Sequence, residues 1–131
     1  MKRRTKKIGI VIGITIVLIS NIPVFNLGLL ARLDDGKLRY SNADGSCTRI
    51  EKFNYFSGLI EKEGIEAGIA ARTPPPKEGT TEMYRLYRLN PLYFWRWSYY
   101  LIVSKDFKYK DWKEIEPNRV PYDPDNIGQQ F

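Results

Sequence analysis

The chain has 131 residues and a formal net charge of +6, with one cysteine and no histidine. Six basic residues precede position 34, and residues 34–131 hold 15 basic and 15 acidic residues, so the longer part of the chain is neutral. Neutrality argues against nucleic-acid binding, which needs concentrated basic charge. The lack of histidine excludes the common Cys/His zinc sites and nucleophilic dyads.

The N-terminal segment predicts a membrane anchor. A basic stretch over 1–7, expected to be a cytoplasmic flank, runs into 23 uncharged residues over 8–30, and about 20 apolar residues suffice to cross a bilayer. No small-residue cleavage site follows, which favours an uncleaved anchor over a cleaved signal peptide; a buried helix is the third alternative. The positive-inside rule then predicts a single-pass protein of the bacterial inner membrane, with a cytoplasmic N-terminus and a periplasmic or extracellular domain.

The following segment predicts one small α+β domain over 33–116, with a short antiparallel sheet and two or three short helices. Turn signals at 35–36 and 41–45 enclose a strand over 37–40, and a second strand is expected over 47–50. Apolar residues at helical spacing predict a helix over 51–63 that ends at Gly64. The stretch 65–72 is compatible with a strand or with a weak helix.

The lone cysteine, Cys47, allows two interpretations. It is an unpaired, partly buried thiol, or it forms a disulfide between two copies of the chain in an oxidising compartment. An internal disulfide is excluded because there is no second cysteine.

An aromatic segment over 84–112 contains eleven aromatic residues, including all three tryptophans. Alternation predicts a strand over 84–89, and Asn90-Pro91 is typical of a helix start, here for a helix over 92–103. That helix is apolar nearly all round, so it must be covered by the domain core, by the membrane interface or by a partner protein. The residues predicted to contact a protein partner are Arg85, Arg88, Tyr93, Trp95, Arg96 and Trp97.

The last part of the chain shows one local signal, a capping box formed by Asp111 and Glu114. Basic residues alternate with aromatics over 105–113, but nearby acids cancel the charge, so no nucleic-acid site is expected. Residues 117–131 are predicted to be an extended, proline-containing tail.

No catalytic, cofactor-binding or metal-binding motif is found. Two carboxylate pairs, Glu61 with Glu63 and Asp123 with Asp125, lie in charge-mixed or tail segments where solvent exposure is the simpler account. We therefore expect no enzyme activity, no cofactor and no metal. The hypothesis is a membrane-anchored extracytoplasmic protein that contacts lipid through 8–30 and binds a protein at the outer membrane face, of an immunity or complex-accessory type. The alternative is a membrane-surface or envelope-structural protein with an interfacial aromatic helix.

Overall fold

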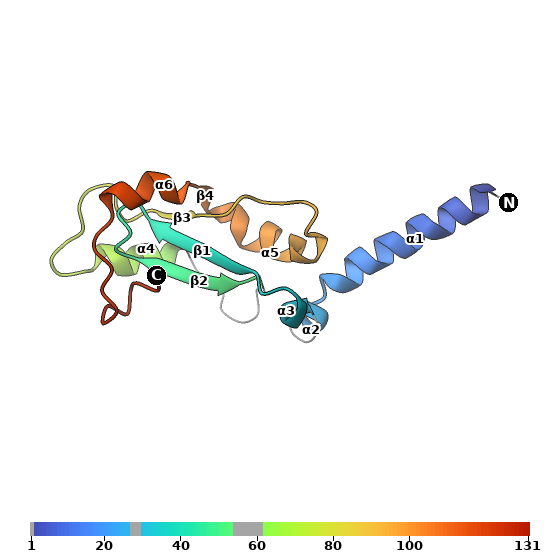
Figure 1. The fold of residues 1–131 in the computed structure, drawn as a ribbon, viewed down its shortest axis with the longest axis horizontal. Coiled ribbons are helices and arrows are strands. Elements are labelled where there is room, and N and C mark those ends of the chain that lie inside the picture. The colour runs from blue at the N-terminus through green and yellow to red at the C-terminus, as the bar shows by residue number, and fades with distance from the viewer. Residues whose placement is uncertain (1, 27–29, 54–61) are drawn as a thin grey trace.

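In a computed structural model the chain forms a small α+β domain from which one long helix projects (Figure 1). The structure describes residues 2–26, 30–53 and 62–131. Its α-helices are α1 (Lys2–Ser20), α2 (Pro23–Phe25), α3 (Ala31–Leu33), α4 (Lys62–Ala70), α5 (Trp97–Ile102) and α6 (Trp112–Ile115). Its strands are β1 (Lys37–Asn42), β2 (Thr48–Lys52), β3 (Met83–Arg85) and β4 (Lys108–Tyr109), and its short 3-10 helices are η2 (Phe94–Arg96), η3 (Ser104–Asp106) and η4 (Glu116–Asn118).

The sheet has the strand order β2-β1-β3-β4. β1 pairs antiparallel with both β2 and β3, but β3 and β4 run parallel. The predicted antiparallel sheet is therefore wrong, and the sheet is mixed. The reason is the helical crossover through α5, which returns the chain to the sheet in the direction of β3 rather than by a hairpin.

The turn between β1 and β2 is organised by Asn42, whose side chain is fully buried. Its Nδ2 donates to Asp44 Oδ1 at 2.8 Å, Ser46 Oγ at 2.9 Å and the Thr80 carbonyl at 2.8 Å. Its Oδ1 accepts from the Cys47 amide at 2.9 Å. One amide side chain thus holds the hairpin turn closed and ties it to the approach to β3.

The core lies on one face of the sheet, under α4 and α5. Leu38 and Tyr40 alternate along β1 with Lys37 and Arg39, so the first two point into the core and the last two point to the opposite, outer face. The buried core residues are Leu38, Tyr40, Cys47, Phe53, Ile69, Met83, Tyr99, Tyr100, Val103 and Phe107.

The predicted transmembrane anchor is wrong. Among residues 2–26, 30–53 and 62–131, no helix combines the length and the apolar character that crossing a membrane requires. α1 is 19 residues long, and its basic first turns leave only Ile8 to Ser20 uncharged, which is about 20 Å of helix against a hydrocarbon thickness of about 30 Å. The chain then turns before Pro23, which begins a separate helix. The prediction of a single-pass protein of the inner membrane depended on this anchor and is not supported either.

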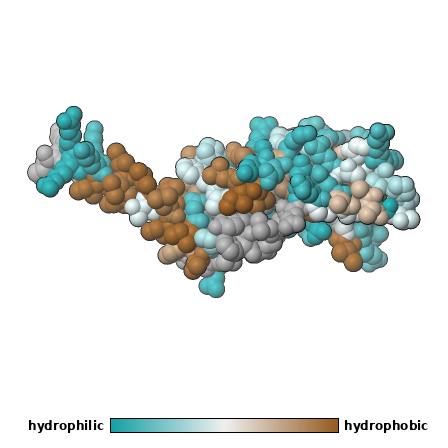
Figure 2. All heavy atoms as spheres, turned by 180° about the vertical axis from the view of Figure 1, so that it is seen from behind, coloured by the Kyte–Doolittle hydropathy of each residue, from teal (hydrophilic) through white to brown (hydrophobic). Residues whose placement is uncertain are grey.

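α1 projects from one end of the domain, and it contacts η2 of the domain near its own C-terminal end (Figure 1). The contact uses Asn21, whose Nδ2 donates to the Phe94 carbonyl and whose Oδ1 accepts from the Ser98 amide, both at 2.8 Å. Figure 2 shows hydrophobic side chains along α1 beyond its basic end and on to the junction with the domain. The uncharged residues of α1 are largely exposed.

Other predicted elements are shifted. Most of the predicted helix over 51–63 lies outside the described residues, but Glu51 and Lys52 belong to β2, and α4 continues through Gly64 instead of ending there. The strand predicted over 84–89 is confined to β3, and the helix predicted over 92–103 is divided into η2 and α5. The capping box at Asp111 is confirmed at the start of α6.

Candidate functional site

Three of the six residues predicted to contact a partner make internal contacts instead. Arg85 donates from Nε to the Phe107 carbonyl at 3.1 Å and from Nη1 to the Tyr87 carbonyl at 2.7 Å. Trp95 and Arg96 both bind Asp34, which lies between α3 and β1. These contacts help to hold the domain together.

The Asp34 carboxylate is enclosed by four donors. Trp95 Nε1 and Arg96 Nε donate to Oδ2 at 2.6 and 2.7 Å, while Arg96 Nη2 and the Gly36 amide donate to Oδ1 at 2.6 and 2.8 Å. Burial raises the pKa of Asp34, but the hydrogen bonds from Arg96, Trp95 and Gly36 outweigh it and hold that pKa below its ordinary value. A side chain at Gly36 would collide with the Arg96 guanidinium, so glycine permits this approach.

The other three predicted residues are exposed. Tyr93 and Trp97 are each 40% exposed, and Arg88 lies at the surface with its guanidinium 5.5 Å from the Tyr109 ring centroid. Tyr99 and Tyr100, also on α5, are buried in the domain core. Of the six predicted residues, Arg88, Tyr93 and Trp97 are thus exposed, and Arg85, Trp95 and Arg96 are half-buried.

A chain of hydroxyl groups crosses the core beneath the sheet. Tyr40 Oη lies 2.6 Å from the hydroxyls of both Tyr99 and Tyr87, and Tyr87 Oη lies 2.6 Å from Ser104 Oγ. Burial raises the pKa of Tyr40 and Tyr99 far above the ordinary tyrosine value, so both phenols are neutral in the folded protein. These mutually bonded hydroxyl groups stabilise the fold. Tyr87 also reaches the surface pocket described next.

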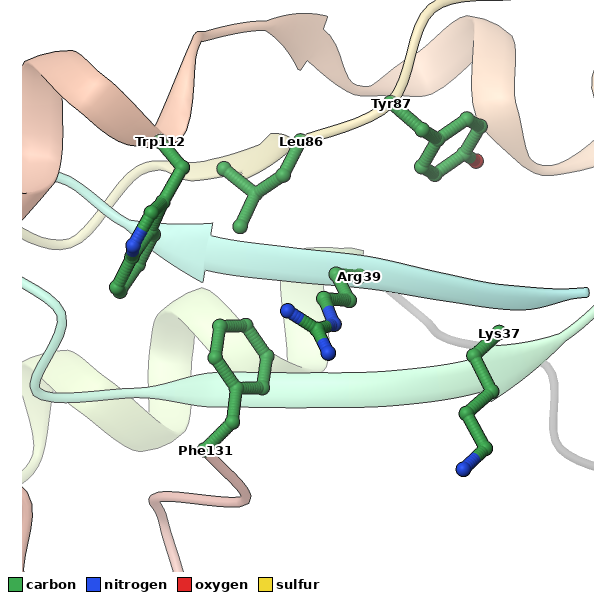
Figure 3. Close-up of a pocket in the computed structure, with 6 residues that line it drawn as sticks. All are labelled: Lys37, Arg39, Leu86, Tyr87, Trp112 and Phe131. Atoms are coloured by element: carbon green, nitrogen blue, oxygen red, sulfur yellow. The ribbon is translucent and has the colours of Figure 1, made fainter.

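An open pocket lies on the outer face of the sheet, opposite the core. It has a volume of about 200 Å³ and is lined by Lys37, Arg39, Leu86, Tyr87, Trp112 and Phe131. In Figure 3, Trp112 and Phe131 lie toward one end, Lys37 lies at the other, and Arg39 lies between them. The pocket therefore has an aromatic end and a cationic end.

The aromatic end is held in place by contacts from several segments. The Trp112 and Phe131 ring centroids are 5.4 Å apart, and Arg119 lies 5.0 Å from the Trp112 ring centroid while its Nη2 donates to the Phe131 carbonyl at 3.1 Å. Thr48 Oγ1 accepts from the amides of Gln130 at 2.8 Å and Phe131 at 3.2 Å. The tail is thus bonded along β2, and this brings Phe131 over the sheet.

The cationic end has no internal acid. Among the described residues, neither Lys37 nor Arg39 takes part in an ion pair. The Arg39 guanidinium lies 5.0 Å from the Phe131 ring centroid, and across the hairpin Lys37 is directly opposite Lys52. Like charges in that position repel each other, and an anion placed between them would relieve the repulsion.

Other chemistry finds no support in the described part of the chain. No three histidine, cysteine or acidic side chains converge there as metal ligands do. Cys47 is a free cysteine that is only 2% exposed, so a disulfide between two copies would require the core to open.

Sequence reasoning missed every residue of the outer pocket. The turn signals predict the strand that holds Lys37 and Arg39, but they do not indicate which of its side chains face away from the core. Nothing local indicated that Phe131 would lie over that face. The chain matches no family model, no curated protein and no solved structure.

Proposed function

We propose that this protein works by binding another protein, and that the partner docks on the outer face of the sheet at the pocket lined by Arg39, Trp112 and Phe131. The observation that carries the proposal is the combination of unpaired cations with positioned aromatic walls at one exposed place. Arginine, tryptophan and tyrosine are the residues most enriched where binding energy concentrates in protein interfaces.

The size of the pocket favours a side chain of a protein over a cofactor. Sites for small molecules and cofactors enclose roughly 300–1,000 Å³ and bury most of the ligand, whereas this pocket holds about 200 Å³ and is open to solvent. A space of this size suits one or two side chains presented by a larger surface. Within this proposal, the protein has an immunity-type or complex-accessory role. Such a role requires binding but no catalysis, and it predicts a stoichiometric complex with the partner.

Photo-crosslinking tests the proposed docking face. A p-benzoylphenylalanine replacing Lys37 is compared with one replacing Glu63, which is exposed on α4 in the layer that covers the opposite face. We expect a partner to be crosslinked in native cells from the Lys37 position and not from the Glu63 position. The captured protein is then identified by mass spectrometry, purified and titrated against the full chain.

Two outcomes would contradict the proposal. One is a protein captured equally from both positions. The other is a purified candidate whose affinity does not change when Leu86, in the pocket wall, is replaced by Asp (Leu86→Asp). A folded variant is verified first by its amide NMR spectrum, so that loss of binding is not loss of structure.

A further inference from the structure

From the outer pocket we infer the chemistry of the partner segment: an acidic stretch that places a carboxylate on Arg39 and packs an aromatic side chain against the wall formed by Trp112 and Phe131. This inference rests on the proposed function and specifies it further. It concerns the ligand of the pocket and not the location or identity of the partner protein.

The charge of the pocket argues for an anion. Lys37, Arg39 and Lys52 lie on the same face because of strand alternation and the hairpin register, in which Lys37 faces Lys52. Among the described residues, no carboxylate forms an ion pair with any of these three side chains. Residues 34–131 as a whole are electrically balanced, so these three neighbouring cations are a local excess of positive charge and not part of a generally basic domain.

The chemistry of Arg39 favours a carboxylate in particular. Its guanidinium carbon lies 5.0 Å from the Phe131 ring centroid, and a guanidinium presents its N–H donors as a planar fork that can form two parallel hydrogen bonds with a carboxylate. No acceptor for these donors lies within hydrogen-bonding distance among the described residues. A carboxylate oxygen pair fits this fork better than a single-atom acceptor does.

The Asp34 cluster provides an internal example of the same recognition. There Arg96 lies 4.7 Å from the Tyr93 ring centroid and also grips a carboxylate through Nε and Nη2. Arg39 has the aromatic ring but lacks the acid. The outer pocket therefore resembles a carboxylate site whose acid must come from another molecule.

The aromatic end specifies what should accompany the carboxylate. Trp112, Phe131 and Leu86 form an apolar wall beside Arg39 (Figure 3). The Trp112 and Phe131 rings already pack on each other at a tilt of 60°, and an aromatic side chain of a ligand can pack against such rings in an offset or edge-to-face arrangement. Because Thr48 and Arg119 already hold Phe131, little ordering cost remains when a ligand binds.

Peptide titration tests this ligand chemistry. The full chain, labelled with ¹⁵N, is titrated with a blocked peptide of sequence Gly-Glu-Phe-Asp-Phe-Glu-Gly. Control peptides replace the acids by Gln and Asn, or both Phe residues by Ala, and inorganic phosphate is titrated separately. We expect saturable shifts at Arg39, Leu86 and the Trp112 indole with the acidic aromatic peptide, and binding at least about tenfold weaker with either control.

A matched pair of variants locates the carboxylate. Arg39→Gln should weaken the peptide by about tenfold or more. Arg88→Gln should leave the affinity unchanged, although Arg88 also lies over an aromatic ring, that of Tyr109. Equal losses in both variants would overturn the assignment, as would equal binding of the uncharged peptide. Phosphate binding as tightly as the peptide would show an anion site without peptide recognition, which also contradicts the inference.

The peptide titration and the crosslinking test can contradict the ligand inference and the proposed function independently of each other. If a protein is captured at the Lys37 position but its contacting segment carries no acid, the proposed function stands and the acidic-ligand inference falls. If the peptide binds as expected but no partner is captured from that position, the ligand chemistry stands and the docking proposal falls.

Discussion

The two faces of β1 treat polar side chains in opposite ways. On the inner face, Tyr40 and Asn42 are completely buried, and the hydrogen-bonding groups of both side chains have partners. On the outer face, Lys37 and Arg39 are exposed and have no acidic partner among the described residues. Neighbouring residues of one strand therefore serve two purposes, one structural and one available to a ligand.

The difference follows from solvation. A buried polar group without a partner costs about 1–3 kcal/mol, so the inner face must satisfy its own polar atoms. Water solvates an exposed cation, and leaving it unpaired costs the fold almost nothing. Substitutions on the inner face should therefore change mainly the stability of the fold, and substitutions on the outer face should change mainly ligand binding.

The largest expected effect is on the inner face. Asn42→Ala removes the partner of the Cys47 amide and of the Thr80 carbonyl, so the free energy of unfolding should fall by about 3–4 kcal/mol. Urea denaturation measures this change. Asn118→Ala, at an exposed position, should change the free energy by less than about 0.5 kcal/mol. Similar values for the two variants would contradict the contrast between the faces.

The next largest effect on stability is expected at the ion pair between Arg96 and Asp34. Asp34→Asn should lower the free energy of unfolding by about 2–3 kcal/mol, because it leaves the Arg96 guanidinium partly buried without its countercharge. Asp35→Asn is the matched control, since Asp35 is exposed. A loss of the same size in the control would show that charge alone, and not the enclosed geometry, accounts for the effect.

The pH dependence of the Asp34 effect has a defined sign. Because the folded pKa of Asp34 lies below its ordinary value, its contribution is present above about pH 4 and is lost as the pH falls through the folded pKa. The difference in free energy of unfolding between wild type and Asp34→Asn should therefore shrink below about pH 4. A difference that stays constant down to about pH 2 would contradict this.

A smaller effect is expected from the hydroxyl chain. Tyr40→Phe removes the hydroxyl that bonds both Tyr87 and Tyr99, so each of these two phenols loses one hydrogen-bond partner. The free energy of unfolding should therefore fall by about 1–2 kcal/mol. Tyr122→Phe, on the exposed tail, should be close to neutral. Equal stability of both variants would show that the chain adds nothing to the fold.

Alkaline titration gives an independent measure of the same chain. The raised pKa of Tyr40 and Tyr99 means that these phenols stay protonated in the folded protein above about pH 10, where the unfolded chain ionises. Their stabilising contribution is present below that pH and is lost as the pH rises further. Tyrosinate absorbance should therefore appear in two stages, the second coinciding with unfolding. A single stage without unfolding would contradict the burial of these groups.

The smallest effect on stability is expected on the outer face. Arg39→Gln should change the free energy of unfolding by less than about 0.5 kcal/mol, because an exposed arginine over an aromatic ring contributes little. Urea denaturation beside the peptide titration makes the comparison direct. A loss above about 1 kcal/mol would mean that Arg39 is structural, as Arg96 is.

Local signals predicted the parts of the fold that depend on neighbours in the chain. Turn signals on both sides predicted a strand over 37–40, which is part of β1, and the spacing of Asp111 and Glu114 predicted the start of α6. The anchor failed for a different reason. Composition counted uncharged residues, but the helix ends at Ser20 because Pro23 and the bonds of Asn21 to the domain stop it there.

The candidate site could not be read from the chain in the same way. The arginine-rich aromatic segment looked like a partner surface, but Arg96 is paired with Asp34, and Arg85 is bonded to backbone carbonyls. Arg39 looked ordinary, and its importance comes from Phe131, which Thr48 holds above it. Whether an arginine is free depends on which acids the fold brings near it, and spacing along the chain does not contain that information.

The sequence alone determined the balance of charge after residue 33, the absence of histidine and the two strands on either side of the turn at 41–45, because these depend on composition and on short-range geometry. The tertiary structure alone decided how the first helix is attached to the domain, how β4 joins the sheet, which arginines are satisfied and where the pocket lies. Those outcomes come from hydrogen bonds and ring contacts between residues far apart in the chain, and such contacts exist only once the elements have packed.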